Sequence, residues 1–110
     1  MNNIFDQNKE IQQIVERLKP KFNPTKVFLF GSRAKNLQNN ESDYDLFFII
    51  EKSELTHIKR LQLAHRLLWG LDLSVDIFIY TQDEFKEWEN ETSSIANIVK
   101  TEGFEVMLGQ

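Results

Sequence analysis

The sequence predicts one α/β domain, in the α+β sense of a small mixed β-sheet flanked by helices. Two observations lead to this prediction. Short apolar runs alternate with stretches whose apolar residues recur at helical spacing, and polar turns separate them. The chain has 110 residues, enough for one hydrophobic core but not for a catalytic half plus a substrate-recognition half. We therefore expect a single domain over residues 1–110.

The first half of the chain predicts a helix and two strands. Residues 6–19 are expected to be helical and to stop at Pro20, because proline cannot donate the helical hydrogen bond. Residues 26–30 (KVFLF) and 45–50 (DLFFII) are apolar without alternation, which is typical of buried strands. The helix prediction rests on four apolar residues at helical spacing: Ile11, Ile14, Val15 and Leu18.

Between these two strands the sequence predicts a turn and a short helix. Gly31 is expected to end the first strand, and Ser32 to cap a short helix that runs to about Leu37. Residues 36–42 (NLQNNES) are then a polar turn.

The second half predicts a helix, a strand and two further helices. Residues 54–69 form the first of these helices, and Gly70 caps its end. Residues 73–80 (LSVDIFIY) form the third strand, and Thr81 with Glu84 makes a capping box for the next helix. The apolar stripe expected on the 54–69 helix is Leu55, Ile58, Leu61 and Leu68, and that of the last helix, ending at Gly103, is Ile95, Ile98 and Val99.

Composition excludes several classes of function. The net charge of −4 and the pI of about 5.2 leave no basic field for nucleic acid, so no direct nucleic-acid binding is expected. The chain has no cysteine, which removes disulfides, zinc–thiolate sites and thiol catalysis. No apolar run is long enough to span a membrane and no signal-peptide pattern is present, so the expected location is cytoplasmic.

Three aspartates stand where strands are expected to start. Asp43 and Asp45 are two residues apart and project to the same face if the extended conformation begins by residue 43. Asp76 interrupts the apolar third strand, where a carboxylate must be protonated, paired or bound to a metal. If the second and third strands are neighbours, Asp45 and Asp76 repel each other, and a divalent cation removes that conflict. Oxygen ligands without cysteine or nearby histidine favour Mg²⁺, which leaves room for substrate phosphates.

A phosphate-binding turn is expected beside these carboxylates. Glycine at position 31 lets the backbone approach a ligand closely, and a helix starting at Ser32 presents free N–H groups to an anion. For Ser32 to lie near the aspartates, the first strand must run antiparallel to the second. The connection over residues 51–72 is long enough for a crossover, which makes the second and third strands parallel.

Gly31-Ser32, Asp43-x-Asp45 and an aspartate in the next strand resemble the motifs of the polymerase-β-like nucleotidyltransferase superfamily. With "GSRAK", "SDYDLFFII" and the short length, the chain looks most like the minimal nucleotidyltransferase branch, over residues 26–80. The resemblance implies that Gly31 and Ser32 bind the nucleoside triphosphate, with Arg33 as a possible further contact. It implies that Asp43, Asp45 and Asp76 are catalytic and hold two Mg²⁺ ions, with ATP as substrate.

The same resemblance implies a protein partner. Minimal nucleotidyltransferases are often paired with a HEPN-domain toxin, and as antitoxins they transfer AMP to a tyrosine of that ribonuclease. The sequence departs from the usual motif at two positions: Asn36 stands where glycine is frequent, and Tyr44 where an aliphatic residue is usual. Asparagine tolerates a left-handed backbone, so the turn is expected to survive.

Other conspicuous side chains have structural interpretations. Tyr44 points away from its flanking aspartates and is expected in the core. His57 and His65 lack the spacing of a helical metal-binding pair and are expected on a helix surface. Phe85 is expected to pack in the core, whereas Trp88, in the acidic stretch 83–91, is the better candidate for a partner interface.

Three alternative functions remain open from the sequence. A non-catalytic antitoxin would neutralise its partner by covering it, but would not need Gly-Ser and all three aspartates together. A nucleotidyltransferase acting on a small molecule generally has an extra domain that is missing here. Templated or RNA-tailing synthesis conflicts with the small size and the acidic charge.

Overall fold

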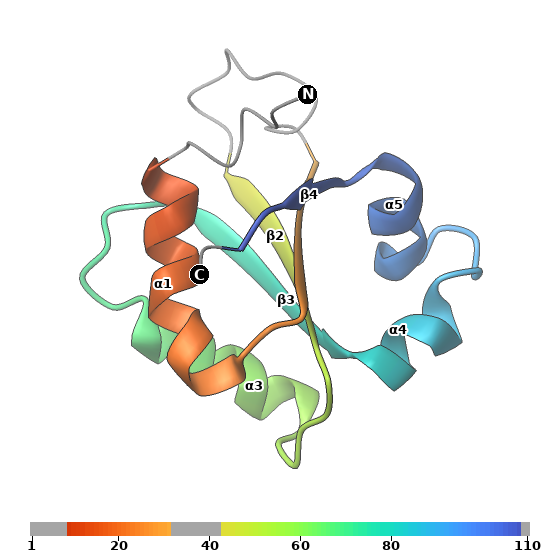
Figure 1. Ribbon diagram of the computed structural model, residues 1–110, viewed down its shortest axis with the longest axis horizontal. Helices are drawn as coiled ribbons and strands as arrows, with labels where there is room; N and C mark the ends of the chain where they lie inside the picture. The colour runs from red at the N-terminus through yellow and green to blue at the C-terminus, as the bar shows by residue number, and fades with distance from the viewer. Residues whose placement is uncertain (1–8, 32–42, 109–110) are drawn as a thin grey trace.

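A computed structural model describes residues 9–31 and 43–108 of the chain. Within these residues a four-stranded sheet lies between two layers of helices (Figure 1). The elements, in chain order, are α1 (Lys9–Phe22), β1 (Lys26–Phe30), β2 (Tyr44–Ile50), α3 (His57–Leu67), β3 (Val75–Thr81), α4 (Gln82–Trp88), α5 (Ile95–Glu102) and β4 (Phe104–Val106). The predicted cap at Ser32, the helix to Leu37, the turn over 36–42 and Asn36 lie outside the described residues.

The sheet has the mixed topology that the sequence predicts. Its strand order is β3-β2-β1-β4, with β1 antiparallel to β2 and to β4, and β2 parallel to β3. The parallel pair is joined through α3, as expected for a crossover connection. The N-terminal ends of β2 and β3 therefore lie side by side, next to the C-terminal end of β1.

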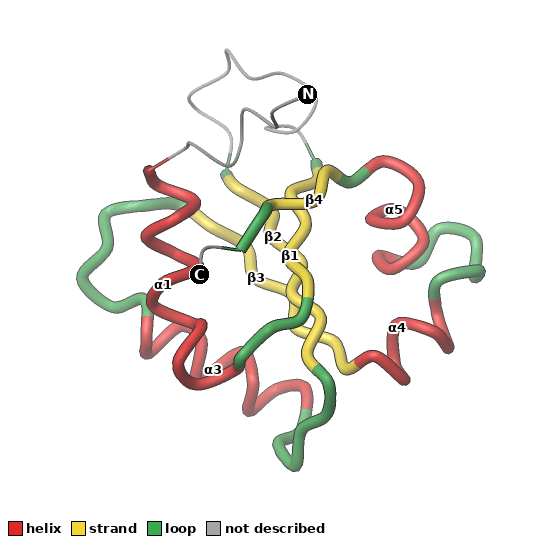
Figure 2. Tube along the Cα trace, viewed as in Figure 1, coloured by secondary structure: helices red, strands yellow, loops and turns green. Residues whose placement is uncertain are grey.

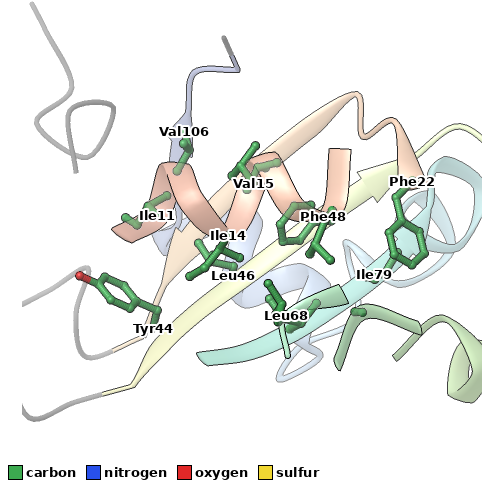
Figure 3. Packing of buried hydrophobic residues seen from close by; sticks show 14 of the residues in the cluster. Ile11, Ile14, Val15, Phe22, Tyr44, Leu46, Phe48, Leu68, Ile79 and Val106 are labelled. Atoms are coloured by element: carbon green, nitrogen blue, oxygen red, sulfur yellow. The ribbon is translucent and has the colours of Figure 1, made fainter. Parts of the chain in front are cut away.

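Each face of the sheet is covered by a different pair of helices. α1 and α3 cover one face, and α4 and α5 cover the other (Figures 1 and 2). Alternation along β2 divides its side chains between the two cores: Leu46 and Phe48 pack under α1 (Figure 3), whereas Phe47 and Ile49 pack under α5. Tyr44 is 4% exposed in the first core, which confirms its predicted structural place.

α1 continues past Pro20, so the prediction that proline ends this helix is wrong. Pro20 lies in the last turn with its side chain exposed, and the helix runs on to buried Phe22. It ends at Asn23, whose left-handed φ of 44° and N–H bond to Lys19 O (2.8 Å) close the final turn. Proline costs one hydrogen bond here, and burial of Phe22 offsets that cost.

α3 begins later than predicted, at His57, with Thr56 as its N-cap accepting from Lys59 N at 3.2 Å. Leu55 and Ile58 are 38% and 67% exposed, so the prediction that they face the core is wrong. The buried positions of α3 are Arg60 and Ala64, four residues apart on one face. Gly70, with φ of 92°, lies in the turn after the helix, near the predicted cap.

Arg60 joins three elements from a buried position, being 4% exposed. Its Nη1 donates to Glu84 Oε1 (2.7 Å) and to Ile79 O (3.1 Å), its Nη2 donates to Glu84 Oε2 (3.1 Å), and its Nε donates to Leu55 O (3.2 Å). The hydrogen bonds from Arg60 are the main reason that the pKa of Glu84 is lowered. A bidentate ion pair of this kind fixes α3, β3 and α4 relative to one another.

The C-terminal half largely follows the prediction. Thr81 and Glu84 form the capping box of α4, and α5 ends before Gly103. Phe85 packs against Phe47 with ring centroids 5.7 Å apart, as expected for a core residue, and Trp88 is 46% exposed. The edge strand β4 was not predicted. None of the helices in the described segments is long and apolar enough to cross a membrane.

Candidate active site

The fold brings Asp45 and Asp76 together as direct partners across the parallel strands β2 and β3. Both side chains lie on the face covered by α4 and α5, because Asp45 alternates with Tyr44 and Leu46 of the opposite core. Asp45 is half-buried and Asp76 is exposed at the start of its strand. The predicted pairing of these two carboxylates is thus confirmed, and it lies at the N-terminal ends of the two strands.

The raised pKa of Asp45 agrees with the predicted repulsion between Asp45 and Asp76. Burial raises the pKa of the Asp45 carboxyl from 3.8 to about 6, with further contributions from the charge of Asp76, a hydrogen bond to Asp76 and the charge of Asp43. Asp43 itself is exposed directly before β2. The three carboxylates therefore share one electrostatic environment, and a cation bound there would relieve their repulsion.

Gly31 packs directly against Asp45. It follows β1 with a left-handed φ of 78°, and Phe30 is the β1 partner of Asp45. A Cβ at position 31 would overlap Asp45 Oδ2 and lie 3.0 Å from the carboxyl carbon. Glycine is required twice over, by the backbone conformation and by the space that the carboxylate occupies. Ser32 and Arg33, the other predicted nucleotide contacts, lie outside the described residues.

Asp45 and Asp76 are the carboxylates available to a Mg²⁺ ion at this site. Within residues 9–31 and 43–108, no three acidic or histidine side chains converge to form a ready metal-binding group. Mg²⁺ is usually held through one or two carboxylates plus substrate phosphates, so Asp45 and Asp76 fit it as protein ligands. Asp43 contributes charge from close by.

Two aromatic rings that the sequence analysis did not single out lie beside the carboxylates. Phe78 is two residues after Asp76 and on the same face, and its ring centroid is 5.6 Å from that of Phe30. The sequence could have indicated this position, because Phe78 is two residues after Asp76 and strand side chains two apart share a face. The apolar residues around Phe78 instead favoured its interpretation as an ordinary core residue. Phe30 and Phe78 form an apolar floor next to the carboxylates.

The histidines lie where the sequence placed them, on the surface and outside this site. His57 and His65 are both exposed on α3. The ring of His57 packs edge-on against Tyr80, with centroids 5.6 Å apart. Neither histidine lies on β2 or β3, the strands that carry the aspartates.

Asp45→Asn is expected to stabilise the protein at pH 7 by about 1 kcal/mol, a figure reduced for solvent screening. Because the folded-state pKa is raised, the folded protein binds more protons than the unfolded chain between pH 4 and 6. Wild-type stability should therefore fall as pH rises through that window, relative to the asparagine variant. Urea unfolding of both proteins at pH 4, 5, 6 and 7 measures this, with exposed Asp72→Asn as the control. Equal stabilities of wild type and Asp45→Asn at all four pH values would contradict it.

Comparisons with known proteins agree with this geometry. The family model described as polymerase beta, nucleotidyltransferase, matches residues 9–101. The search of curated proteins finds no match.

Solved structures share the fold. A crystal structure of a mutant of the toxin–antitoxin MntA-HpeT is 23% identical, covering 91% of this chain and 73% of that chain with a TM-score of 0.62. A toxin–antitoxin crystal structure with AMP-PNP is 24% identical, covering 94% and 76%, with a TM-score of 0.61. A protein from Sulfolobus solfataricus described as a nucleotidyltransferase is 27% identical, covering 72% and 70%, with a TM-score of 0.57.

Proposed function

The chain belongs to the polymerase beta nucleotidyltransferase family and is a nucleotidyltransferase, and from this premise we propose that it transfers AMP from ATP to a protein hydroxyl. The acceptor is a tyrosine of a HEPN-domain ribonuclease toxin, and the chain is the antitoxin of that toxin. The observation that carries the proposal is the pairing of Asp45 with Asp76 across β2 and β3, directly beside Gly31.

The residues divide the chemistry between them. Gly31, and with it Ser32 and Arg33 of the predicted turn, contacts the triphosphate through backbone groups. Asp45 and Asp76, with Asp43 close by, hold Mg²⁺, which when bound neutralises phosphate charge and lowers the pKa of the acceptor hydroxyl. Asp76 is exposed at the start of its strand, and we infer that the acceptor hydroxyl approaches it there.

In the proposed reaction the acceptor oxygen forms a bond to the α-phosphorus of ATP. The bond between the α-phosphorus and the oxygen leading to the β-phosphate breaks, and pyrophosphate leaves with that electron pair. The hydroxyl proton passes to the Asp76 carboxylate or to water beside it. The chain supplies position and charge, and no covalent intermediate with the protein is needed.

A partner protein explains how so small a domain can act. The described residues form one sheet between two helical layers, and no second domain is present in them to hold an acceptor. Two of the similar structures are toxin–antitoxin proteins, and one of these is a structure with AMP-PNP, an ATP analogue. These likenesses support an ATP-type substrate and a toxin partner.

The test is intact-mass spectrometry of a purified HEPN-domain toxin before and after incubation with this chain, ATP and Mg²⁺. The expected result is a gain of about 329 Da, or a multiple of it, on the toxin. The toxin should stay inactive after the chain is removed, because a phosphodiester persists whereas a covering interface follows mass action. Asp76→Asn should bind the toxin without adding mass. If the toxin mass does not change, and the wild type and Asp76→Asn both neutralise the toxin, the chain is a binding antitoxin and the enzymatic proposal is wrong.

A further inference from the structure

The outer edge of the sheet at β3 is divided into two unlike halves. β3 is an edge strand, and Tyr44 N donates to Ser74 O at 3.0 Å. With the register that pairs Asp45 with Asp76, this bond fixes which backbone groups of β3 face β2. The groups that face outward, away from the sheet, belong to the odd-numbered residues Val75, Ile77, Ile79 and Thr81.

Side chains close the C-terminal half of this edge. Arg60 donates to Ile79 O at 3.1 Å, and Glu84 accepts from Thr81 N at 2.8 Å. Because Arg60 and Glu84 are also bonded to each other, the ion pair occupies the positions that a neighbouring strand would take. No further strand can pair with β3 beyond Ile79.

The N-terminal half of the β3 edge is not closed by side chains in this way. In the described segments no hydrogen bond reaches the outward backbone groups of Val75 or Ile77. A hollow of about 420 Å³ lies beside Val75 and is lined on its other sides by α3 and the turn that follows it. Trp69, which is 85% exposed, stands at this hollow. Val75 is partly exposed and Ile77 is 5% exposed, so the half of the edge that flanks Asp76 is the part whose outward backbone groups lack a hydrogen-bond partner among the described residues.

We propose that residues 75–77 of β3 are the docking edge for the acceptor, which binds as an extended segment carrying the reactive hydroxyl. This inference rests on the proposed function. Paired N–H and C=O groups two residues apart are complementary to another extended chain. The residue opposite Asp76 on the added strand would have its Cβ about 5 Å from that of Asp76. Its neighbours on the other face would enter the hollow beside Trp69.

The ion pair gives this docking edge a defined limit. Because Arg60 and Glu84 block the edge from Ile79 onward, an added segment cannot slide toward the C-terminal end of β3. Register is otherwise weakly specified along a bare strand edge. The block therefore limits the range of registers in which an acceptor residue can stand opposite Asp76.

Hydrogen exchange followed by NMR tests the docking edge in the unmodified protein. Complex formation with the HEPN toxin should slow exchange of the Val75 and Ile77 amides at least about tenfold, and leave the Thr81 amide unchanged. Unchanged exchange at Val75 and Ile77 in a stable complex would overturn the inference. Protection that depends on the concentration of the chain alone would assign the edge to a second copy instead and would equally overturn it.

Val75→Pro tests the same edge by kinetics. Proline removes the outward N–H of Val75 without touching the ladder to β2, and edge strands accept it. The KM for the toxin should rise at least about tenfold, while the dissociation constant for ATP stays the same. Lys52→Pro, in the exposed loop after β2, is the control for the substitution. If Val75→Pro does not fold, the exchange experiment on the wild type decides.

The two proposals fail differently. A wild type that adds no AMP to the toxin refutes the proposed function. A wild type that adds AMP, with a Val75→Pro variant whose KM is unchanged, refutes the docking edge alone.

Discussion

Gly31→Ala is expected to slow nucleotidyl transfer at least about a hundredfold, because the carboxylate of Asp45, which we propose takes part in the reaction, would be displaced by about 1 Å or more. The added methyl group would overlap Asp45 Oδ2, and the carboxylate is the group free to move. Its displacement separates Asp45 from Asp76 and removes the paired arrangement on which the proposed reaction depends. The fold should survive with a loss of about 1 to 2 kcal/mol from the left-handed backbone.

Gly70→Ala provides a closely matched control. Gly70 also has a left-handed φ, 92°, but a Cβ there meets nothing within 4 Å. Both variants should lose similar stability in thermal unfolding, and only Gly31→Ala should lose transfer in a steady-state pyrophosphate-release assay. Equal activity of the two variants would show that the contact with Asp45 has no catalytic role.

Arg60→Met is expected to lower the free energy of unfolding by about 2 kcal/mol, because the buried guanidinium makes four hydrogen bonds, while its ion-pair partner Glu84 is 39% exposed and can be solvated. Methionine fills a similar volume but donates no hydrogen bond. It would leave Ile79 O without its donor and Glu84 without its cation. The junction of α3, β3 and α4 would lose its central connection.

Arg66→Met is the matched control on the same helix, because Arg66 is exposed. It should change stability by no more than about 0.5 kcal/mol. Arg60→Lys should fall between the two, since lysine keeps the charge but not the two-pronged geometry. Urea unfolding at constant pH gives the three values, and equal losses for Arg60→Met and Arg66→Met would contradict a structural role of the ion pair.

The sequence predicted the sheet and the carboxylate pair because strong local signals agreed with the chemistry. Apolar runs defined β1, β2 and β3, and a proximity requirement between Ser32 and the aspartates predicted the strand directions, which the structure confirms. The register that pairs Asp45 with Asp76 was only one of those open to two parallel neighbours, and the structure shows it. The functional roles of all six residues remain predictions: Gly31, Ser32, Arg33, Asp43, Asp45 and Asp76.

The features of the fold that were not predicted from the sequence depend on tertiary contacts. Burial of Phe22 carries α1 past Pro20, a long-range effect that local propensity does not contain. Arg60 resembles an ordinary surface arginine until Glu84 is brought to it by the fold. β4 has a single buried residue, Val106, too little for a periodic signal. Leu55 and Ile58 fit a helical stripe, but the helix starts too late and faces elsewhere.

The pairing of Asp45 with Asp76 also has a consequence for folding kinetics. These two residues meet only after the long crossover through α3 has closed, so their repulsion first acts when β2 and β3 align. A chain emerging from the ribosome can therefore form the β1–β2 pairing without that electrostatic penalty, and meets the penalty when β3 pairs with β2. Refolding at pH 5 should accordingly be faster than at pH 7.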